Sequence, residues 1–241
     1  MICKLCQKEK EIINSHIIPR AFFEFLYPEQ EEKRESLIMI SKDRYDKRRP
    51  VGSYEKLLCK DCDQMLGRYD DYAQQLLLKT PLSFYPNVGN LAYVINSYDY
   101  FKLKMFFISL LWRSSISELE EFSLINCGPF EERLRELILS NFIGSEDEFS
   151  IFVTKFDSEN LEVKKVAEAS ILLPAKQKVE ALNYSIFYLP KGYKIYIKVD
   201  KRMTPDVFFK LVLKDKKPLI ILKKIDYEKS KEYRILLDSL K

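Results

Sequence analysis

Four cysteines near the start of the chain have the spacing of a metal site. Cys3 and Cys6 form one Cys-x-x-Cys pair, and Cys59 and Cys62 form a second pair. Two residues between cysteines let both sulfurs turn toward one ion, and two such pairs supply the four thiolates that zinc prefers. Because four protein thiolates leave no open coordination position, we expect a structural Zn²⁺ rather than a catalytic one.

The only histidine, His16, lies between the two pairs, in the segment Ser-His-Ile-Ile-Pro-Arg. A neutral imidazole can take a proton from water near pH 7, which makes His16 a candidate general base. Hydrolysis of a phosphodiester also calls for a divalent cation, and Asp63 and Asp70 are candidate oxygen ligands. Seven residues apart on a helix, these two carboxylates share a face. For Asp63, a role as a capping or helix-dipole residue is the alternative.

Basic side chains near these motifs are candidate contacts to a phosphate backbone. Such contacts give salt-dependent binding with little sequence preference. A solvated charged loop is the alternative for residues 42–50, because Asp43 and Asp46 dilute the positive charge there. The candidates for nucleic-acid binding are Arg20, Arg44, Lys47, Arg48, Arg49 and Lys60.

Three further residues are expected to have structural roles in the protein core. Cys127 has no partner cysteine at metal-site spacing and is predicted to pack as a small apolar residue. Trp112 is predicted to be a core aromatic, and Arg113 to form an internal ion pair, rather than a platform for stacking bases.

The composition places these motifs in an ordinary globular protein. The chain has 241 residues, of which 46% are hydrophobic and 32% charged, and its net charge of +4 is too mild to establish a nucleic-acid partner. Residues 191–241 are the basic end, with 15 Lys and Arg against 7 Asp and Glu. The paired cysteines do not have the pattern of a secreted disulfide framework, and we find neither an apolar leader nor a long apolar run. These features predict a cytoplasmic protein without a membrane segment.

Apolar periodicity predicts the elements that must position the motifs. Helix periodicity follows the second cysteine pair, and alternating apolar residues dominate the last third of the chain. The turn Pro-Lys-Gly at 190–192 predicts a hairpin. Helices are predicted at 21–27, 63–79, 98–115 and 129–140, from 205 and from 227, and strands at 37–40, 91–95, 149–153, 169–173, 184–188, 193–199 and 219–222.

These elements predict an α+β protein with three parts. Residues 1–80 form a zinc-bound module, residues 81–145 a helical middle, and residues 146–241 an α+β domain with an antiparallel sheet. A homo-oligomer or a partner protein bound through the C-terminal domain is a further expectation.

The motifs together resemble a known family. The order Cys-x-x-Cys, Ser-His-Ile-Ile-Pro-Arg and Leu-Leu-Cys-x-x-Cys-Asp, with a helix behind it, resembles the zinc-ribbon branch of the HNH endonucleases, the ββα-metal nucleases. Within that branch it resembles a bacterial group with a Ser-His-Ile-Ile-Pro motif, whose helix start is matched by Cys62-Asp63 and Tyr69-Asp70. Residues 98–113 and 127–135 also resemble the downstream part of that group, so the resemblance covers about residues 1–140.

The resemblance implies both a fold and an activity. It implies a ββα-metal or treble-clef-like module in which His16 lies at the end of a β-hairpin, facing the helix after Cys62. It also implies hydrolysis of DNA, or of RNA, with Mg²⁺ or Mn²⁺ as cofactor, in bacterial or phage defence. The family usually has an aspartate before the histidine and an asparagine where this chain has Tyr54. Here Ser15 precedes His16, so the catalytic carboxylates would be Asp63, Asp70 or another such as Glu55.

Three functions are therefore open from the sequence. The first is a metal-dependent nuclease with His16 as general base. The second is a catalytically inactive, zinc-scaffolded subunit that binds a nucleic acid or a partner. The third is a protein-interaction module in which zinc only fixes the fold.

Overall fold

The computed structural model describes residues 1–26, 38–39, 47–48, 52–86 and 88–239. Its helices are α1 (Arg20–Glu24), α2 (Lys60–Gln74), α3 (Tyr100–Ile116), α4 (Glu131–Leu139), α5 (Leu161–Glu168), α6 (Asp206–Phe209) and α7 (Lys231–Ser239), with shorter turns η1 (Gln75–Lys79), η2 (Gly89–Leu91), η3 (Glu120–Phe122), η4 (Gly128–Phe130) and η5 (Tyr227–Lys229). Its strands are β1 (Ile12–His16), β2 (Ile38–Met39), β3 (Lys47–Arg48), β4 (Tyr54–Cys59), β5 (Ser83–Phe84), β6 (Ala92–Ile95), β7 (Ile151–Phe156), β8 (Ala175–Val179), β9 (Leu182–Leu189), β10 (Tyr193–Lys198) and β11 (Leu219–Lys224). These elements confirm the predicted α+β class.

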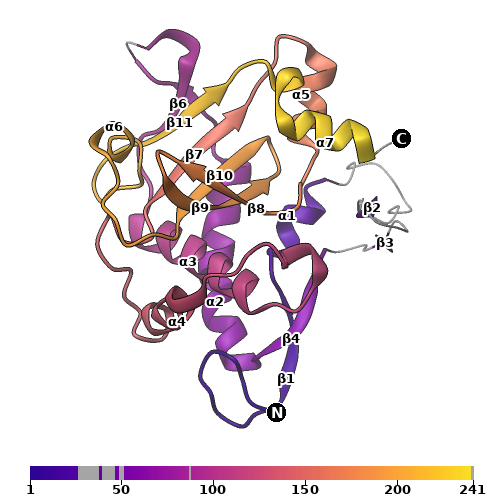
Figure 1. The fold of residues 1–241 in the computed structure, drawn as a ribbon, viewed down its shortest axis with the longest axis vertical. Coiled ribbons are helices and arrows are strands. Elements are labelled where there is room, and N and C mark those ends of the chain that lie inside the picture. The colour runs from indigo at the N-terminus through magenta and orange to yellow at the C-terminus, as the bar shows by residue number, and fades with distance from the viewer. Residues whose placement is uncertain (27–37, 40–46, 49–51, 87, 240–241) are drawn as a thin grey trace.

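One end of the molecule is a two-stranded sheet followed by a helix. Strands β1 and β4 pair antiparallel, from Ile12 opposite Cys59 to His16 opposite Tyr54. Helix α2 begins directly after β4, and Figure 1 shows the N-terminal loop, β1 and β4 gathered around the lower part of this helix. The chain therefore brings both cysteine pairs to one end of the sheet and His16 to the other.

The other end is a seven-stranded sheet in the order β5-β6-β11-β7-β10-β9-β8. Neighbouring strands are antiparallel except β11 and β7, which run parallel, so the sheet is mixed rather than antiparallel throughout. Strands β5 and β6 belong to residues 83–95, so the sheet combines the middle of the chain with its C-terminal part.

Helix α3 is the centre of the larger core. Its residues from Leu103 to Ser114 are all buried, which is typical of a helix surrounded by protein on every side. The N-cap Asp99 accepts a hydrogen bond from the Lys102 amide at 2.9 Å, which satisfies one of the open donors of the first turn. This core joins α2, α3, α4 and one face of the sheet. A second core on the opposite face includes Phe152, Tyr184 and Tyr196.

Two expectations in the C-terminal part were wrong. Residues 169–173 are not a strand, and the edge strand β8 begins at Ala175. Residues 161–168, for which no helix was expected, form α5, because the Asn160 side chain accepts hydrogen bonds from the amides of Glu162 and Val163 and caps the first turn. The predicted hairpin turn at 190–192 is present, with Lys191 and Gly192 both at positive φ.

The basic segment falls largely outside the described residues. Arg44 and Arg49 lie there, and so do both end residues of the predicted strand at 37–40, of which Ile38–Met39 form β2. Lys47 and Arg48 form β3, which pairs antiparallel with β2. Within the described parts of the chain, no helix combines the length and apolar character needed to cross a lipid bilayer.

Candidate metal centre and the adjoining cavity

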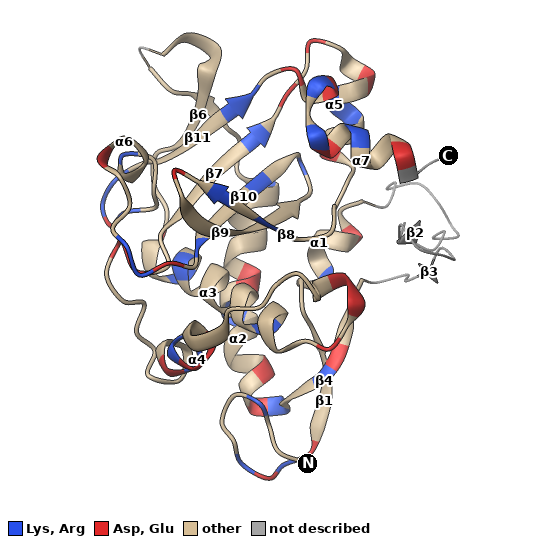
Figure 2. Ribbon diagram, viewed as in Figure 1, with Lys and Arg blue, Asp and Glu red and all other residues tan. Residues whose placement is uncertain are grey.

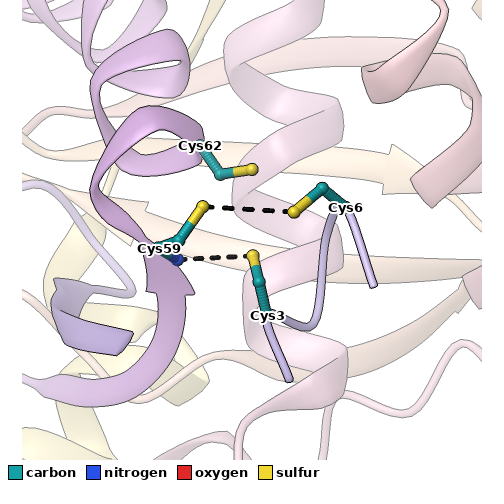
Figure 3. Close-up of side chains that lie close together, drawn as sticks. All are labelled: Cys3, Cys6, Cys59 and Cys62. Atoms are coloured by element: carbon teal, nitrogen blue, oxygen red, sulfur yellow. Dashed lines mark hydrogen bonds between the residues drawn. The ribbon is translucent and has the colours of Figure 1, made fainter. Parts of the chain in front are cut away.

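The four paired cysteines meet at one point. Their sulfur atoms all lie within 4.8 Å of one another, and the Cys6 and Cys59 sulfurs are 4.0 Å apart (Figure 3). Sulfurs bound to a tetrahedral zinc ion at about 2.3 Å are about 3.8 Å apart, so the spacing suits such an ion. The cluster is thus positioned to hold a metal ion, as the sequence predicts, and is compatible with structural zinc.

Local backbone structure presents these sulfurs. Gln7, just after the first pair, has a φ of 57°, and its amide donates to the Cys3 carbonyl at 2.9 Å, which closes a tight knuckle. Cys59 is both the last residue of β4 and the N-cap of α2, so Cys62 lies in the first turn of that helix. The Cys59 amide donates to the Cys3 sulfur at 3.3 Å. The second pair therefore belongs to a helix start and the first to a loop that folds against it.

The chemistry of the cluster also suits a cation. Burial and the neighbouring cysteines raise the pKa of Cys62 well above its ordinary value. Four thiolates packed this closely repel one another unless a cation lies between them, and a bound metal ion deprotonates its thiol ligands. Cys127, by contrast, is buried away from the cluster, as predicted, and burial raises its pKa to about 11.

His16 lines a cavity of about 270 Å³ between β1, α1 and α2. The cavity brings together three residues that the sequence singled out for catalysis, namely His16, Asp63 and Asp70, and the predicted phosphate contact Arg20. The remaining lining residues are Pro19, Ala21, Glu24, Gly67, Asp71, Gln74 and Arg113. The cavity therefore lies between the end of β1, where it pairs with β4, and one face of α2.

Arg113 on α3 links two walls of this cavity through hydrogen bonds. Its guanidinium donates to both carboxylate oxygens of Asp70, at 2.7 and 2.8 Å, and to the backbone carbonyl of His16 at 3.1 Å. The Arg113 side chain is only 2% exposed, and that of Asp70 is 14% exposed. Burial raises the pKa of Asp70, and the adjacent guanidinium opposes that rise. The internal ion pair predicted for Arg113 is confirmed, and its partner is one of the expected catalytic carboxylates.

The other carboxylates of the cavity differ in what they contact. Glu24 forms an ion pair with Arg20 at 2.8 Å. Asp63 and Asp71 have no ion-pair partner within the described parts of the chain, and both face the cavity from α2. Among the described residues, the four cysteines alone bring three or more metal-ligating side chains this close together. Asp63 and Asp71 lie about 12 Å apart along α2, so a cation in the cavity would rely on one of these carboxylates, water and its substrate.

Several predicted or alternative site residues lie elsewhere. Lys60 is exposed at the start of α2 and does not line the cavity. Glu55 accepts a hydrogen bond from the Ser117 hydroxyl at 2.7 Å. Ser15 is 1% exposed, because alternation along β1 turns it to the face opposite His16. Tyr54 stands across the hairpin from His16, with the two ring centres 5.7 Å apart.

Sequence reasoning missed Gly67, Asp71 and Gln74. With Asp63 and Asp70 they lie at helical spacing on one face of α2, so extending the periodicity from Asp63 would have found them. Comparison with protein-family models, with curated proteins and with solved structures finds no match to this chain.

Proposed function

We propose that this chain is a zinc-scaffolded, metal-dependent nuclease of the ββα-metal type. The observation that carries the proposal is the His16 cavity, where the end of a β-hairpin faces carboxylates on the helix that starts at the second cysteine pair. The general resemblance of the motifs supports the same assignment. DNA is the substrate that we propose, with RNA as the alternative.

The zinc ion in this proposal has a purely structural role. Cys3, Cys6, Cys59 and Cys62 would hold it, and four thiolates leave no position for water or substrate. The ion would tie the N-terminal knuckle to the junction of β4 and α2. Its contribution is to fix the angle between the hairpin that carries His16 and the helix that carries Asp63.

His16 in this proposal accepts the proton of the attacking water while the phosphodiester bond opens. Asp63 or Asp71, which lie about 12 Å apart along α2, would supply one carboxylate ligand to the Mg²⁺ or Mn²⁺ ion, and the ion when bound would stabilise the negative charge that develops on the phosphate. Arg20 is exposed at the cavity rim and would contact a neighbouring phosphate oxygen. Asp70 becomes a positioning residue, because both of its oxygens are engaged by Arg113.

Three other observations favour a second function. Arg113 neutralises Asp70, Ser15 faces away from the cavity, and the carboxylates do not form a three-ligand group among the described residues. These features suit a catalytically inactive subunit that uses the same cavity rim to bind a nucleic acid or a partner.

Incubation of supercoiled plasmid with the zinc-loaded protein and Mg²⁺ or Mn²⁺ separates the two functions. We expect nicking by the wild type and by Lys178→Gln, a control in an exposed β8 position, and loss of nicking in His16→Ala. Equal nicking by wild type and His16→Ala would exclude His16 as the base. Binding of DNA that falls steeply with salt, without nicking by any variant, would instead support the inactive subunit.

A further inference from the structure

A larger cavity, of about 500 Å³, lies where α1, the segment after α2 and the C-terminal sheet meet. This volume is within the range of sites that bind small molecules. Its wall comprises Phe25 and Leu26 after α1, Thr80, Pro81 and Leu82 after α2, Lys155 and Tyr193 from the sheet, Lys165, Glu168 and Ala169 from α5 and its end, and Lys191 from the β9–β10 turn. It is separate from the His16 cavity, which α1 itself lines, whereas only the residues just after α1 line the larger cavity.

Lys155 is a buried cation in this wall. Its side chain is 7% exposed, and its ammonium contacts the Glu168 carboxylate at 2.8 Å and the Lys191 carbonyl. The ammonium has three donors, so one remains after these two contacts. Burial lowers the pKa of Lys155, and the hydrogen bond with Glu168 opposes that effect. A buried ammonium is unfavourable unless it is paired, and Glu168 supplies the ionic partner of Lys155.

Tyr193 places a polar atom in the same wall without a partner. The residue is 1% exposed, and its hydroxyl has no hydrogen-bond partner among the described residues. The Lys155 ammonium is 5.9 Å from the centre of its ring, which is no hydrogen bond to the hydroxyl. A buried hydroxyl left unpaired is unfavourable, so such groups in native proteins generally find a partner. A ligand in the cavity would supply one.

The rest of the wall combines positive charge with apolar surface. Lys165 and Lys191 add two more cations, and Glu168 is the one carboxylate among the lining residues, although Lys165 also forms an exposed ion pair with Glu162 at 2.8 Å. Phe25 is 42% exposed, and the Lys191 ammonium lies 5.7 Å from the centre of its ring. Figure 2 shows that α5 and the ends of β7 and β11 also carry basic residues. The wall therefore presents an excess of positive charge next to an aromatic ring and a proline.

The turn that carries Lys191 is held in place by α5. Lys191 has a φ of 64°, a left-handed conformation that is unfavourable for a residue with a side chain. Its amide donates to the Glu168 carbonyl at 2.8 Å, and the Gly192 carbonyl accepts from the Phe156 amide at 2.8 Å. Two hydrogen bonds therefore fix the backbone of the turn that carries the Lys191 ammonium, so the wall is preorganised on this side.

We propose that this cavity binds a small organic anion with a flat apolar body, its anionic group held by Lys165 and Lys191 and its polar edge by the Tyr193 hydroxyl. Nucleoside monophosphates and aromatic carboxylates share this chemistry. The binding site does not depend on the proposed nuclease activity, because its residues are distinct from those around His16.

The probe for this site is 1-anilinonaphthalene-8-sulfonate, an aromatic sulfonate whose fluorescence rises in apolar surroundings. We expect saturable binding at one site on the full, zinc-loaded chain. The double variant Lys165→Gln/Lys191→Gln should bind at least about tenfold more weakly, since each lost charged contact costs about that factor. Lys178→Gln, exposed on β8 and outside the wall, is the matched control.

Tyr193→Phe separates binding from folding. Removal of an unpaired buried hydroxyl should leave the melting temperature unchanged or higher, while it weakens probe binding about threefold. Displacement of the probe by adenosine monophosphate or by 2-naphthoate then identifies the phosphate or the carboxylate class. Equal probe binding by the wild type, the double variant and Tyr193→Phe, with neither competitor displacing the probe, would overturn the proposal.

Discussion

Arg113 shows how one side chain fixes the geometry of the candidate site. It contacts the Asp70 carboxylate and the His16 carbonyl from a buried position on α3. Removal of one partner from a buried ion pair leaves an uncompensated charge, so we expect Arg113→Met to lower the free energy of unfolding by about 3–5 kcal/mol. Urea denaturation followed by circular dichroism measures this change in the free energy of unfolding.

The matched control for that variant is Arg133→Ala. Arg133 also forms an ion pair with a glutamate, Glu148, but its side chain is 43% exposed. Exposed pairs contribute at most about 1 kcal/mol. If both variants lost equally little stability, Arg113 would not hold the walls of the cavity together.

The ion pairs of Asp157 should make the stability of the protein depend on pH. Burial alone would raise the pKa of this carboxyl, but hydrogen bonds from Lys223 and Lys164 outweigh burial and lower the pKa to about 2. A carboxylate whose pKa is lowered on folding stabilises the protein above its unfolded pKa of about 4, and that stability is lost as the pH falls toward 2. We expect Asp157 to contribute about 2 kcal/mol above pH 5.

Urea denaturation of wild type and Asp157→Asn at pH 5 and pH 3 tests this dependence. The stability difference between the two proteins should shrink at the lower pH, because the wild-type carboxylate then loses its advantage. Asp226→Asn, in an exposed pair with Lys229, is the control and should follow the wild-type profile. A difference that stayed constant between the two pH values would contradict the assigned cause.

At the scale of elements, α2 carries the helical half of the candidate site. Gly67 lies in its middle, faces the cavity, and has open space where a methyl group would be added. Alanine is favoured over glycine inside a helix by about 1 kcal/mol, so Gly67→Ala should raise the melting temperature by several degrees. Calorimetry measures the change.

A second glycine provides the contrast. Gly192 has a φ of 75°, and an added Cβ would lie 3.2 Å from the Phe156 carbonyl oxygen. Gly192→Ala should therefore destabilise the protein by more than about 1 kcal/mol. Destabilisation by Gly67→Ala would contradict the open space beside α2, and stabilisation by Gly192→Ala would contradict the strained position of Gly192.

Local periodicity predicted the elements whose apolar pattern is long. The helices α2 and α3 and the strands β9 and β10 lie within a few residues of their predicted ranges. Helix α5 was missed because it is short and its start is marked only by the Asn160 cap. The strand expected at 169–173 was wrong because an apolar run of that length does not identify its own partner.

The candidate site was predictable only where a motif encodes it. The cysteine spacing predicts the cluster, whereas a position of His16 opposite the helix after Cys62 is implied only by the family resemblance. The pairing of Asp70 with Arg113 joins α2 to α3 across a long separation in the chain, and no local pattern specifies it. The same applies to the larger cavity, whose wall comes from the residues after α1, from α5 and from the sheet.

At the scale of the whole molecule, the cysteine cluster lies at one end and the seven-stranded sheet at the other (Figure 1). If zinc fixes the N-terminal module, Cys59→Ser should make the first 80 or so residues sensitive to protease and lower the bound zinc below one ion per chain. Cys127→Ser removes a cysteine outside the cluster and should keep its zinc. An unaltered digestion pattern together with no metal in the wild type would contradict the structural role.

Chemical rescue can establish whether His16 acts as the general base that we propose. With Mg²⁺ or Mn²⁺ and zinc-loaded protein, we expect His16→Ala to nick plasmid about 100-fold or more slowly than the wild type. Added imidazole should restore part of that rate in His16→Ala and leave the wild-type rate unchanged. Equal nicking by wild type and His16→Ala, with no effect of imidazole on either, would contradict the role of His16 as general base.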